Sequence, residues 1–240
     1  MNRKPVIWGM ILTLVFCGSF SSRLAAESNQ PLEMEADIIE YNSVSGDLTA
    51  RGGVTMNQGG AVLTGQQAEY NTKTKEAHVT GGVKVIRDNA TLTAAEARAY
   101  DNNHIIATGE VVLTKGDNTL TGPQVDYYSD RNYAVAINNA RLTMAEGVMT
   151  AVTIEAFMNE NRAVGKGDVH IVSEVRKLDA TADQADYYGG EQGQGGKAIL
   201  TGNPRAVQDG NVLTGNSLII YLDNKVMNAE GKTKLIIQPQ

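Results

Sequence analysis

The ten residues from Glu76 to Val85, Glu-Ala-His-Val-Thr-Gly-Gly-Val-Lys-Val, decide the class of the fold. Every odd position from Ala77 to Val85 holds an apolar residue or glycine, and most positions between them are polar. Side chains of a β-strand point alternately to its two faces, so this period of two predicts a strand with one apolar face. A lone strand leaves its backbone groups without partners, so the segment must belong to a larger sheet.

The same alternation recurs along the chain, which indicates a repeat architecture. Its seven copies are residues 48–56, 77–85, 105–113, 136–142, 163–171, 198–206 and 227–235. Each copy follows a second short segment that ends in an aromatic residue, and these residues are Tyr41, Tyr70, Tyr100, Tyr127, Phe157, Tyr187 and Tyr221. They are separated by 29, 30, 27, 30, 30 and 34 residues, with polar turns between the paired segments. The chain is therefore predicted to be all-β, with about fourteen short strands in about seven two-strand repeats.

The first 26 residues are typical of a secretory signal peptide. They begin with a short basic stretch that includes Arg3, continue with the apolar run 6–17, and end with small residues that favour cleavage after Ala26. The mature domain would then comprise residues 27–240. Two alternatives stay open: lipidation at Cys17, or retention of residues 6–22 as a membrane anchor, because the uncharged run reaches about the 18 residues that a span requires.

Composition excludes several kinds of site and partner. Cys17 is the only cysteine, so the mature chain would have no disulfide and no thiolate metal site. Removal of residues 1–26 takes away three of the 21 basic residues and none of the 27 acidic ones, which leaves a net charge of 18 − 27 = −9. An acidic surface of this kind repels polyphosphate chains, so nucleic acid is not an expected partner.

The interior is predicted to be built from small residues. Val, Ile, Leu, Ala and Tyr must line it, because Phe and Trp are almost absent, and many inward positions are Ala or Gly. A core at native density needs larger side chains, so a folded-over sheet of this composition leaves room for an extended apolar guest. A second interpretation stays open beside it: Gly52, Gly81, Gly109, Gly167 and Gly231 mark strand bends where backbones approach closely.

A search for catalytic chemistry finds little. Two of the three histidines, His78 and His170, fall on polar faces, and His104 falls in an expected turn, so all three are predicted to be solvated. The chain has no His-Glu-x-x-His and no Gly-x-Ser-x-Gly motif. The chain is therefore expected not to be an enzyme and to need neither a cofactor nor a metal ion.

The repeated pattern resembles the OstA/LptA family of periplasmic lipopolysaccharide-transport proteins. The resemblance is clearest in the motifs Ala68-Glu-Tyr70, Val79–Val85, Ala107–Leu113 and Thr201-Gly-Asn-Pro204, and it extends from Leu32 to the C-terminus. Two features depart from the family pattern. The chain has more repeats than a compact family member, and its second half is less regular than its first, with a glycine-rich insertion at residues 189–196.

The resemblance implies a V-shaped antiparallel β-jellyroll whose apolar inner groove holds the acyl chains of lipid A. It also implies a location in the periplasm, binding of lipopolysaccharide, and edge-to-edge assembly with like folds into a bridge between the inner and outer membranes. The expected groove-lining residues are Tyr70, Val79, Val83, Val85, Ala107, Val111, Leu113, Val169 and Ile171. The identity of the lipid, the number of subunits in the bridge and the membrane partner of each end stay open.

The last strand is the expected assembly edge. Leu235, Ile236 and Ile237 are three adjacent aliphatic residues next to the C-terminus, and an apolar strand edge favours pairing with another sheet, here as a head-to-tail homo-oligomer. Two rival functions stay open: a membrane-anchored partner of the same transport pathway, and a structural or adhesive β-solenoid with no lipid ligand.

Overall fold

The computed structural model describes residues 31–239 except 59, 88, 101–103, 129, 191–195, 223 and 225. Within these residues the chain forms one antiparallel sheet of eighteen strands and a single 3-10 turn, η1 (Met158–Glu160). The strands are β1 (Glu33–Glu35), β2 (Ile38–Tyr41), β3 (Asp47–Gln58), β4 (Ala61–Asn71), β5 (Ala77–Arg87), β6 (Ala90–Tyr100), β7 (His104–Lys115), β8 (Asn118–Tyr128), β9 (Tyr133–Met144), β10 (Gly147–Phe157), β11 (Arg162–Ser173), β12 (Leu178–Tyr188), β13 (Lys197–Thr201), β14 (Arg205–Gln208), β15 (Asn211–Thr214), β16 (Ser217–Tyr221), β17 (Met227–Glu230) and β18 (Lys234–Ile236).

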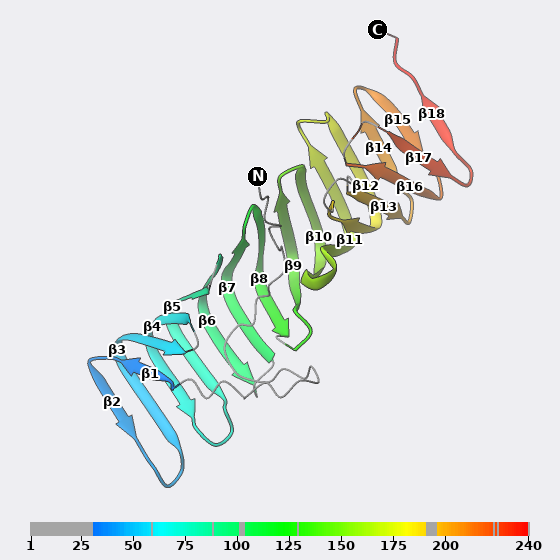
Figure 1. The fold of residues 1–240 in the computed structure, drawn as a ribbon. Coiled ribbons are helices and arrows are strands. Elements are labelled where there is room, and N and C mark those ends of the chain that lie inside the picture. Colours follow the sequence, from blue (N-terminus) through cyan, green and yellow to red (C-terminus); the bar gives the residue numbers. More distant parts are fainter. Residues whose placement is uncertain are drawn as a thin grey trace, which may run out of the picture.

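The strands stack in chain order along one long axis, from β1 and β2 at one end to β17 and β18 at the other (Figure 1). Ten of them, β3 to β12, are continuous strands that span the full width of the sheet, and each such span is here called a crossing. The other eight are halves of four interrupted crossings, β1 with β2, β13 with β14, β15 with β16, and β17 with β18. The described chain therefore makes 10 + 4 = 14 crossings, which agrees with the predicted number of strands.

Each crossing bends near its middle. Pairing between β5 and β6 shifts register between Thr80 and Val83, and the two residues at the shift, Gly81 and Gly82, both have left-handed backbones with φ of 83° and 81°. Similar shifts interrupt the ladders from β3 to β12. Such bulges bend a strand, so every crossing divides into two halves and the sheet into two arms.

Glycine is required at the bend for two reasons. A Cβ atom on Gly81 would lie 2.4 Å from the Cβ of Gln66 on the preceding strand, and its positive φ also disfavours a side chain. The same crowding recurs at Gly109 against Ala95. The bends account for the recurrence of glycine at the same place in most repeats, so the interpretation of these glycines as points of close approach at strand bends is confirmed.

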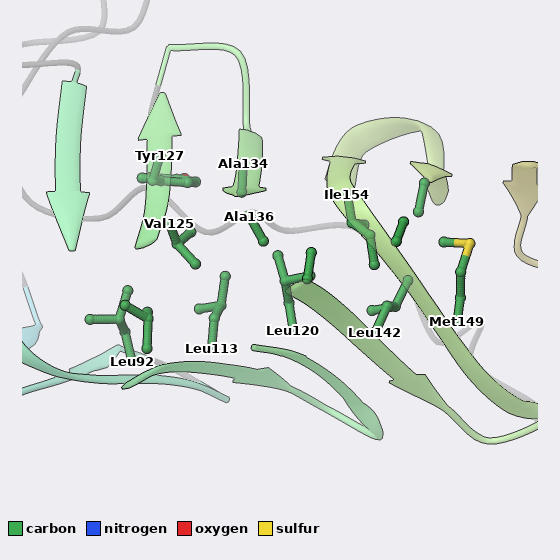
Figure 2. Packing of buried hydrophobic residues seen from close by; sticks show 14 of the residues in the cluster. Leu92, Leu113, Leu120, Val125, Tyr127, Ala134, Ala136, Leu142, Met149 and Ile154 are labelled. Carbon is green, nitrogen blue, oxygen red and sulfur yellow. The ribbon is translucent and has the colours of Figure 1, made fainter. Parts of the chain in front are cut away.

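The two arms face each other across one continuous core (Figure 2). One arm, the leucine arm, presents a row of cross-strand partners rich in long aliphatic side chains, Met56, Leu63, Val85, Leu92, Leu113, Leu120, Leu142, Met149 and Ile171. The other, the tyrosine arm, presents a row of large and small side chains, Tyr70, Ala77, Ala99, Ile105, Tyr127, Ala134, Ala156, Ala163, Tyr187 and Ala198. Small residues beside Tyr127 and Tyr187 leave space for the rings and let the arms close.

Candidate functional site

The space between the arms is an apolar groove whose mouth lies between the strand ends of the two arms. In the N-terminal half it contains a cavity of about 60 Å³, lined by residues of both arms, among them Met56, Leu63, Val79, Val85 and Ile105. A second cavity of about 20 Å³ lies in the C-terminal half, between Met149 and Ile171 of the leucine arm and Tyr187 of the tyrosine arm. The groove is thus nearly filled by the protein's own side chains, and a bulky guest requires the arms to move apart.

All nine residues that the sequence predicts as groove lining are buried between the arms. The structure does not place them equally, however. Val79 and Val85 line the larger cavity and Ile171 lines the smaller one. Val83 and Val111 lie beside the bend and are 1% and 0% exposed, so they belong to the closed floor of the groove.

The aromatic residues that mark the repeat fall into two rows on opposite faces. Tyr70, Tyr127 and Tyr187 point into the groove. Tyr100, Phe157 and Tyr221 each follow the inward-facing position of their own strand by one residue, so they face outward. The outward residues belong to a row of direct cross-strand partners, here called the outer aromatic row, which comprises Tyr100, His104, Tyr128, Tyr133, Phe157, Arg162, Tyr188, Lys197 and Tyr221.

Side chains of the outer aromatic row stack on one another. The ring centroids of His104 and Tyr128 are 4.4 Å apart and the rings are nearly parallel, while those of Tyr133 and Phe157 are 4.9 Å apart. The Arg162 guanidinium lies 3.9 Å from the Phe157 ring centroid. The row therefore braces the outer surface of the tyrosine arm, since ring pairs and cation–π contacts each stabilise by about 0.5–1.5 kcal/mol.

The expectation that His104 is a solvated turn residue is wrong. His104 is the first residue of β7, and its stacking on Tyr128 leaves its side chain only 26% exposed. His78 and His170 do lie on the outer face, each beside a carboxylate, with Nε2 2.9 Å from Glu96 and 3.1 Å from Asp179. No group of three or more His, Cys, Asp or Glu side chains that could hold a metal ion occurs in the part of the chain that the structure describes.

Polar groups cross the mouth of the groove in its C-terminal half. Arg176, in the turn between β11 and β12 of the leucine arm, donates from Nη1 to the backbone oxygens of Tyr221 and Asn224 on the tyrosine arm, at 2.6 Å each. Tyr187 and Glu146 of the leucine arm line the same smaller cavity, and burial together with that carboxylate raises the pKa of Tyr187 to about 12. Both contacts join the arms beside the smaller cavity.

The interior rows run out into solvent at both ends of the sheet. At the N-terminal end, Tyr41 precedes Leu48 and Tyr70 in the row of the tyrosine arm and is 58% exposed. At the C-terminal end, Leu235 of β18 pairs with Leu213 as the last member of the row of the leucine arm and is 59% exposed. Ile236 and Ile237 are exposed as well, so the predicted assembly edge is an open apolar edge.

Several residues of this site were not predicted from the sequence. Leu92, Leu120 and Leu142 supply much of the apolar wall, and Glu146 and Arg176 supply the contacts across the mouth. A signal for the leucines was present, because Leu-Thr recurs near the start of the second strand of most repeats, as at residues 63, 92, 120 and 213. The two polar residues lie in turns of irregular sequence, where no periodicity marks them.

The predicted signal peptide, with its lipidation and anchor alternatives, lies outside the described residues. Within residues 31–239, apart from the gaps noted above, no helix has the length and hydropathy needed to cross a membrane.

Two family models match the chain. A family model described as "LptA/(LptD N-terminal domain) LPS transport protein" matches residues 62–162 and 94–226, and a second, described as "Lipopolysaccharide-assembly, LptC-related", matches residues 22–88. Among solved structures, the chain matches LptH, the LptA-homologous periplasmic component of the lipopolysaccharide transport device of Pseudomonas aeruginosa, with 14% identity and a TM-score of 0.19, over 88% of this chain and 96% of that one. No curated protein matches the chain.

Proposed function

Since the chain belongs to the LptA/LptD N-terminal-domain family of lipopolysaccharide-transport proteins, we propose that it carries lipopolysaccharide through the periplasm with the lipid A acyl chains in the groove between its arms. The observation that carries the proposal is the groove itself. Its two walls are apolar along the whole core cluster, and the larger cavity in it is lined almost entirely by carbon.

The proposed binding mode relies on the tails of the lipid. Burial of a methylene group is worth about 0.8 kcal/mol, so a chain of ~10 carbons gains roughly 8 kcal/mol before ordering costs. A cavity of about 60 Å³ holds only a few water-sized spheres, so the arms separate at the mouth to admit the chain. The acidic surface of the protein disfavours capture of a phosphorylated headgroup, which stays outside in water.

The proposed lining follows from this geometry. Val79, Val85, Leu113 and Ile171, together with Tyr70 and Ala107, contact the acyl chain along the walls, whereas Val83, Val111 and Val169, beside the bend, form the floor that the chain reaches last. The open ends of the interior rows, with Tyr41 at one end and Leu235 at the other, suit edge-to-edge addition of a like fold, because a second sheet would continue both rows.

Extraction of the purified protein with organic solvent, followed by mass spectrometry, tests the proposal. Two adjacent substitutions separate the faces of β4: Leu63 lines the larger cavity and Val62 faces outward. Wild type and Val62→Asp should release acylated lipid in equal amounts, and Leu63→Asp should release at least about tenfold less, with circular dichroism confirming that both variants are folded. Wild-type protein that carries no lipid and takes up none from lipopolysaccharide micelles would overturn the proposal.

A second candidate is a membrane-anchored partner of the same pathway. It is favoured by the match of residues 22–88 to the LptC-related family, a match that begins at residue 22, where the candidate anchor segment 6–22 ends. N-terminal sequencing of the protein isolated from cells separates the two: a start near Glu27 supports the soluble carrier, and an intact Met1 supports the anchored partner.

A further inference from the structure

The mouth of the groove differs between its two halves. In the N-terminal half the larger cavity lies between apolar side chains, and Leu32, from the segment before β1, lines it together with both arms. In the C-terminal half the cavity is a third of that size, and Glu146, Ser173 and Arg176 line it together with apolar residues. The two halves therefore pose different barriers to an acyl chain that enters from the side.

Arg176 makes the stronger of the two contacts across the mouth. One nitrogen of its guanidinium cation donates to two carbonyl oxygens at 2.6 Å each. Hydrogen bonds from a charged donor are roughly twice as strong as neutral ones. The turn that carries Arg176 is itself held from β14, because Gln208 donates to the Arg176 backbone oxygen at 3.3 Å. The backbone of Arg176 is thus held by the leucine arm, while its side chain is hydrogen-bonded to the tyrosine arm.

A second contact lies beside it. Glu146, in the turn between β9 and β10, lines the smaller cavity together with Tyr187, whose ring belongs to the inward row of the tyrosine arm, and the Glu146 carboxylate interacts electrostatically with the Tyr187 hydroxyl. Separation of the arms at this point breaks both contacts and also exposes Ser173, whose buried Oγ has no hydrogen-bond partner in the described structure. The two contacts therefore act on the same movement.

We infer that Arg176, with the Tyr187–Glu146 pair, forms a latch that holds the C-terminal half of the groove closed, so that acyl chains enter sideways in the N-terminal half and pass the latch only when the arms part. This inference rests on the proposed function for its cargo, but the latch is a property of the protein alone. Lys177 provides a matched control, since it lies in the same turn but pairs with Asp209 of its own arm, at 3.9 Å.

A distance measurement tests the latch without any ligand. Spin labels on cysteines at the exposed residues Val175 and Val226, in the full chain with Cys17→Ser, report the separation of the two arms beside Arg176. Arg176→Met keeps an apolar stem and removes the donors, so it should add a population with longer distances. Lys177→Met should leave the wild-type distribution unchanged. Superimposable distributions for Arg176→Met and wild type would overturn the latch.

Two further measurements complete the test. If Arg176→Met does not fold, as judged by circular dichroism, Tyr187→Phe decides, because it keeps the ring and removes only the hydroxyl; it should lengthen the same distance, and an unchanged distance contradicts the latch. Uptake of a fluorescent twelve-carbon fatty acid should be about tenfold faster in Arg176→Met than in Lys177→Met. A longer distance in Arg176→Met, with no fatty-acid uptake by any variant or by wild type, would contradict the proposed function and leave the latch standing. Uptake at equal rates and with equal distances in all variants would support the proposed function and contradict the latch.

Discussion

Gly81 and Gly82 distinguish the two reasons for glycine at the bend, which are a positive φ and a steric contact with the neighbouring strand. Both have positive φ, but a Cβ on Gly81 meets Gln66 at 2.4 Å, whereas a Cβ on Gly82 meets nothing within 4 Å. We therefore expect Gly82→Ala to lower the free energy of unfolding by about 1–2 kcal/mol, the cost of a left-handed alanine. Gly81→Ala should cost at least about 1 kcal/mol more, because the clash forces the backbones apart. Urea denaturation measures both, and equal costs would contradict the close-approach interpretation.

Tyr187 makes stability depend on pH in the alkaline range. Its pKa is about 12 in the folded protein, above the ordinary value of 10, because burial and Glu146 both disfavour the phenolate. A raised pKa of an acid means that the folded state holds the proton more tightly, so its contribution to stability is complete below pH 10 and is lost as the pH rises through 12. Wild type should therefore lose more stability than Tyr187→Phe between pH 10 and 12 in urea titrations. Parallel curves for the two proteins would exclude the buried hydroxyl as the cause.

The direction of individual side chains could be predicted from the sequence wherever the alternation is regular. All nine predicted lining residues point inward, because period two fixes the face of each residue once one is known. The alternation does not report depth along a bent strand, however. Val83 and Leu113 share one inward face in the sequence pattern, but only the bend places Val83 on the floor, where an introduced Asp would unfold the protein before it reported on binding.

The long strands β3 to β12 agree with the repeats, but the aromatic positions show where the sequence is ambiguous. Tyr127 and Tyr128 are adjacent, as are Tyr187 and Tyr188, and a shift of one residue exchanges the inner face for the outer one. The repeat period alone could not show that Tyr100 and Phe157 belong to the outer aromatic row. Nor could it show which crossings break in two, because the break between β13 and β14 arises from a left-handed Asn203 followed by Pro204.

The outer aromatic row should stabilise the sheet measurably. Tyr128 stacks on His104 and lies beneath the guanidinium of Arg131, 4.4 Å from its ring centroid, whereas Tyr41 is mostly exposed at the end of the sheet. We expect Tyr128→Ala to lower the free energy of unfolding by about 2–3 kcal/mol, from lost stacking, cation–π contact and burial. Tyr41→Ala, the same chemical change, should stay within about 0.5 kcal/mol. Equal losses of unfolding free energy for the two variants, in thermal or urea unfolding, would show that the contacts within the outer aromatic row do not stabilise the fold.

In the part of the chain that the structure describes, the sheet ends in an exposed strand on each side. An apolar last edge was predicted from Leu235 to Ile237, and the structure adds a feature that sequence could not supply: the first edge also exposes inward-facing Tyr41 and Ile39. Which residues lie at an end depends on how many crossings stack, and that is a property of the assembled sheet and not of any one repeat. The two ends differ in sequence, so their contact would be heterologous and head-to-tail.

Head-to-tail assembly makes a specific prediction for blocked ends. Wild type should form oligomers that grow with concentration, as measured by light scattering after size-exclusion chromatography. Tyr41→Lys and Leu235→Lys should each be monomeric alone, because each lacks one of the two complementary ends, while Val175→Lys, at an exposed turn, should behave as wild type.

Mixing the two end-blocked variants should restore a dimer and nothing larger, because one intact end of each kind remains. Dimers of either variant alone would indicate contact between identical ends, and a wild type that stays monomeric at every concentration and with lipopolysaccharide would contradict edge-to-edge assembly.

The groove between the arms is tested most directly by photo-crosslinking at Ile105 and Ile106, adjacent residues of the same type on opposite faces of β7. Ile105 lines the larger cavity, and its inward partner across the strand is Tyr127, whereas Ile106 pairs with Asp126 on the outer face. A photoreactive phenylalanine at each position, illuminated in cells that make lipopolysaccharide, should give a lipopolysaccharide adduct at position 105 and none at position 106. Equal labelling at the two positions, or labelling only at 106, would contradict transport of the acyl chains between the arms.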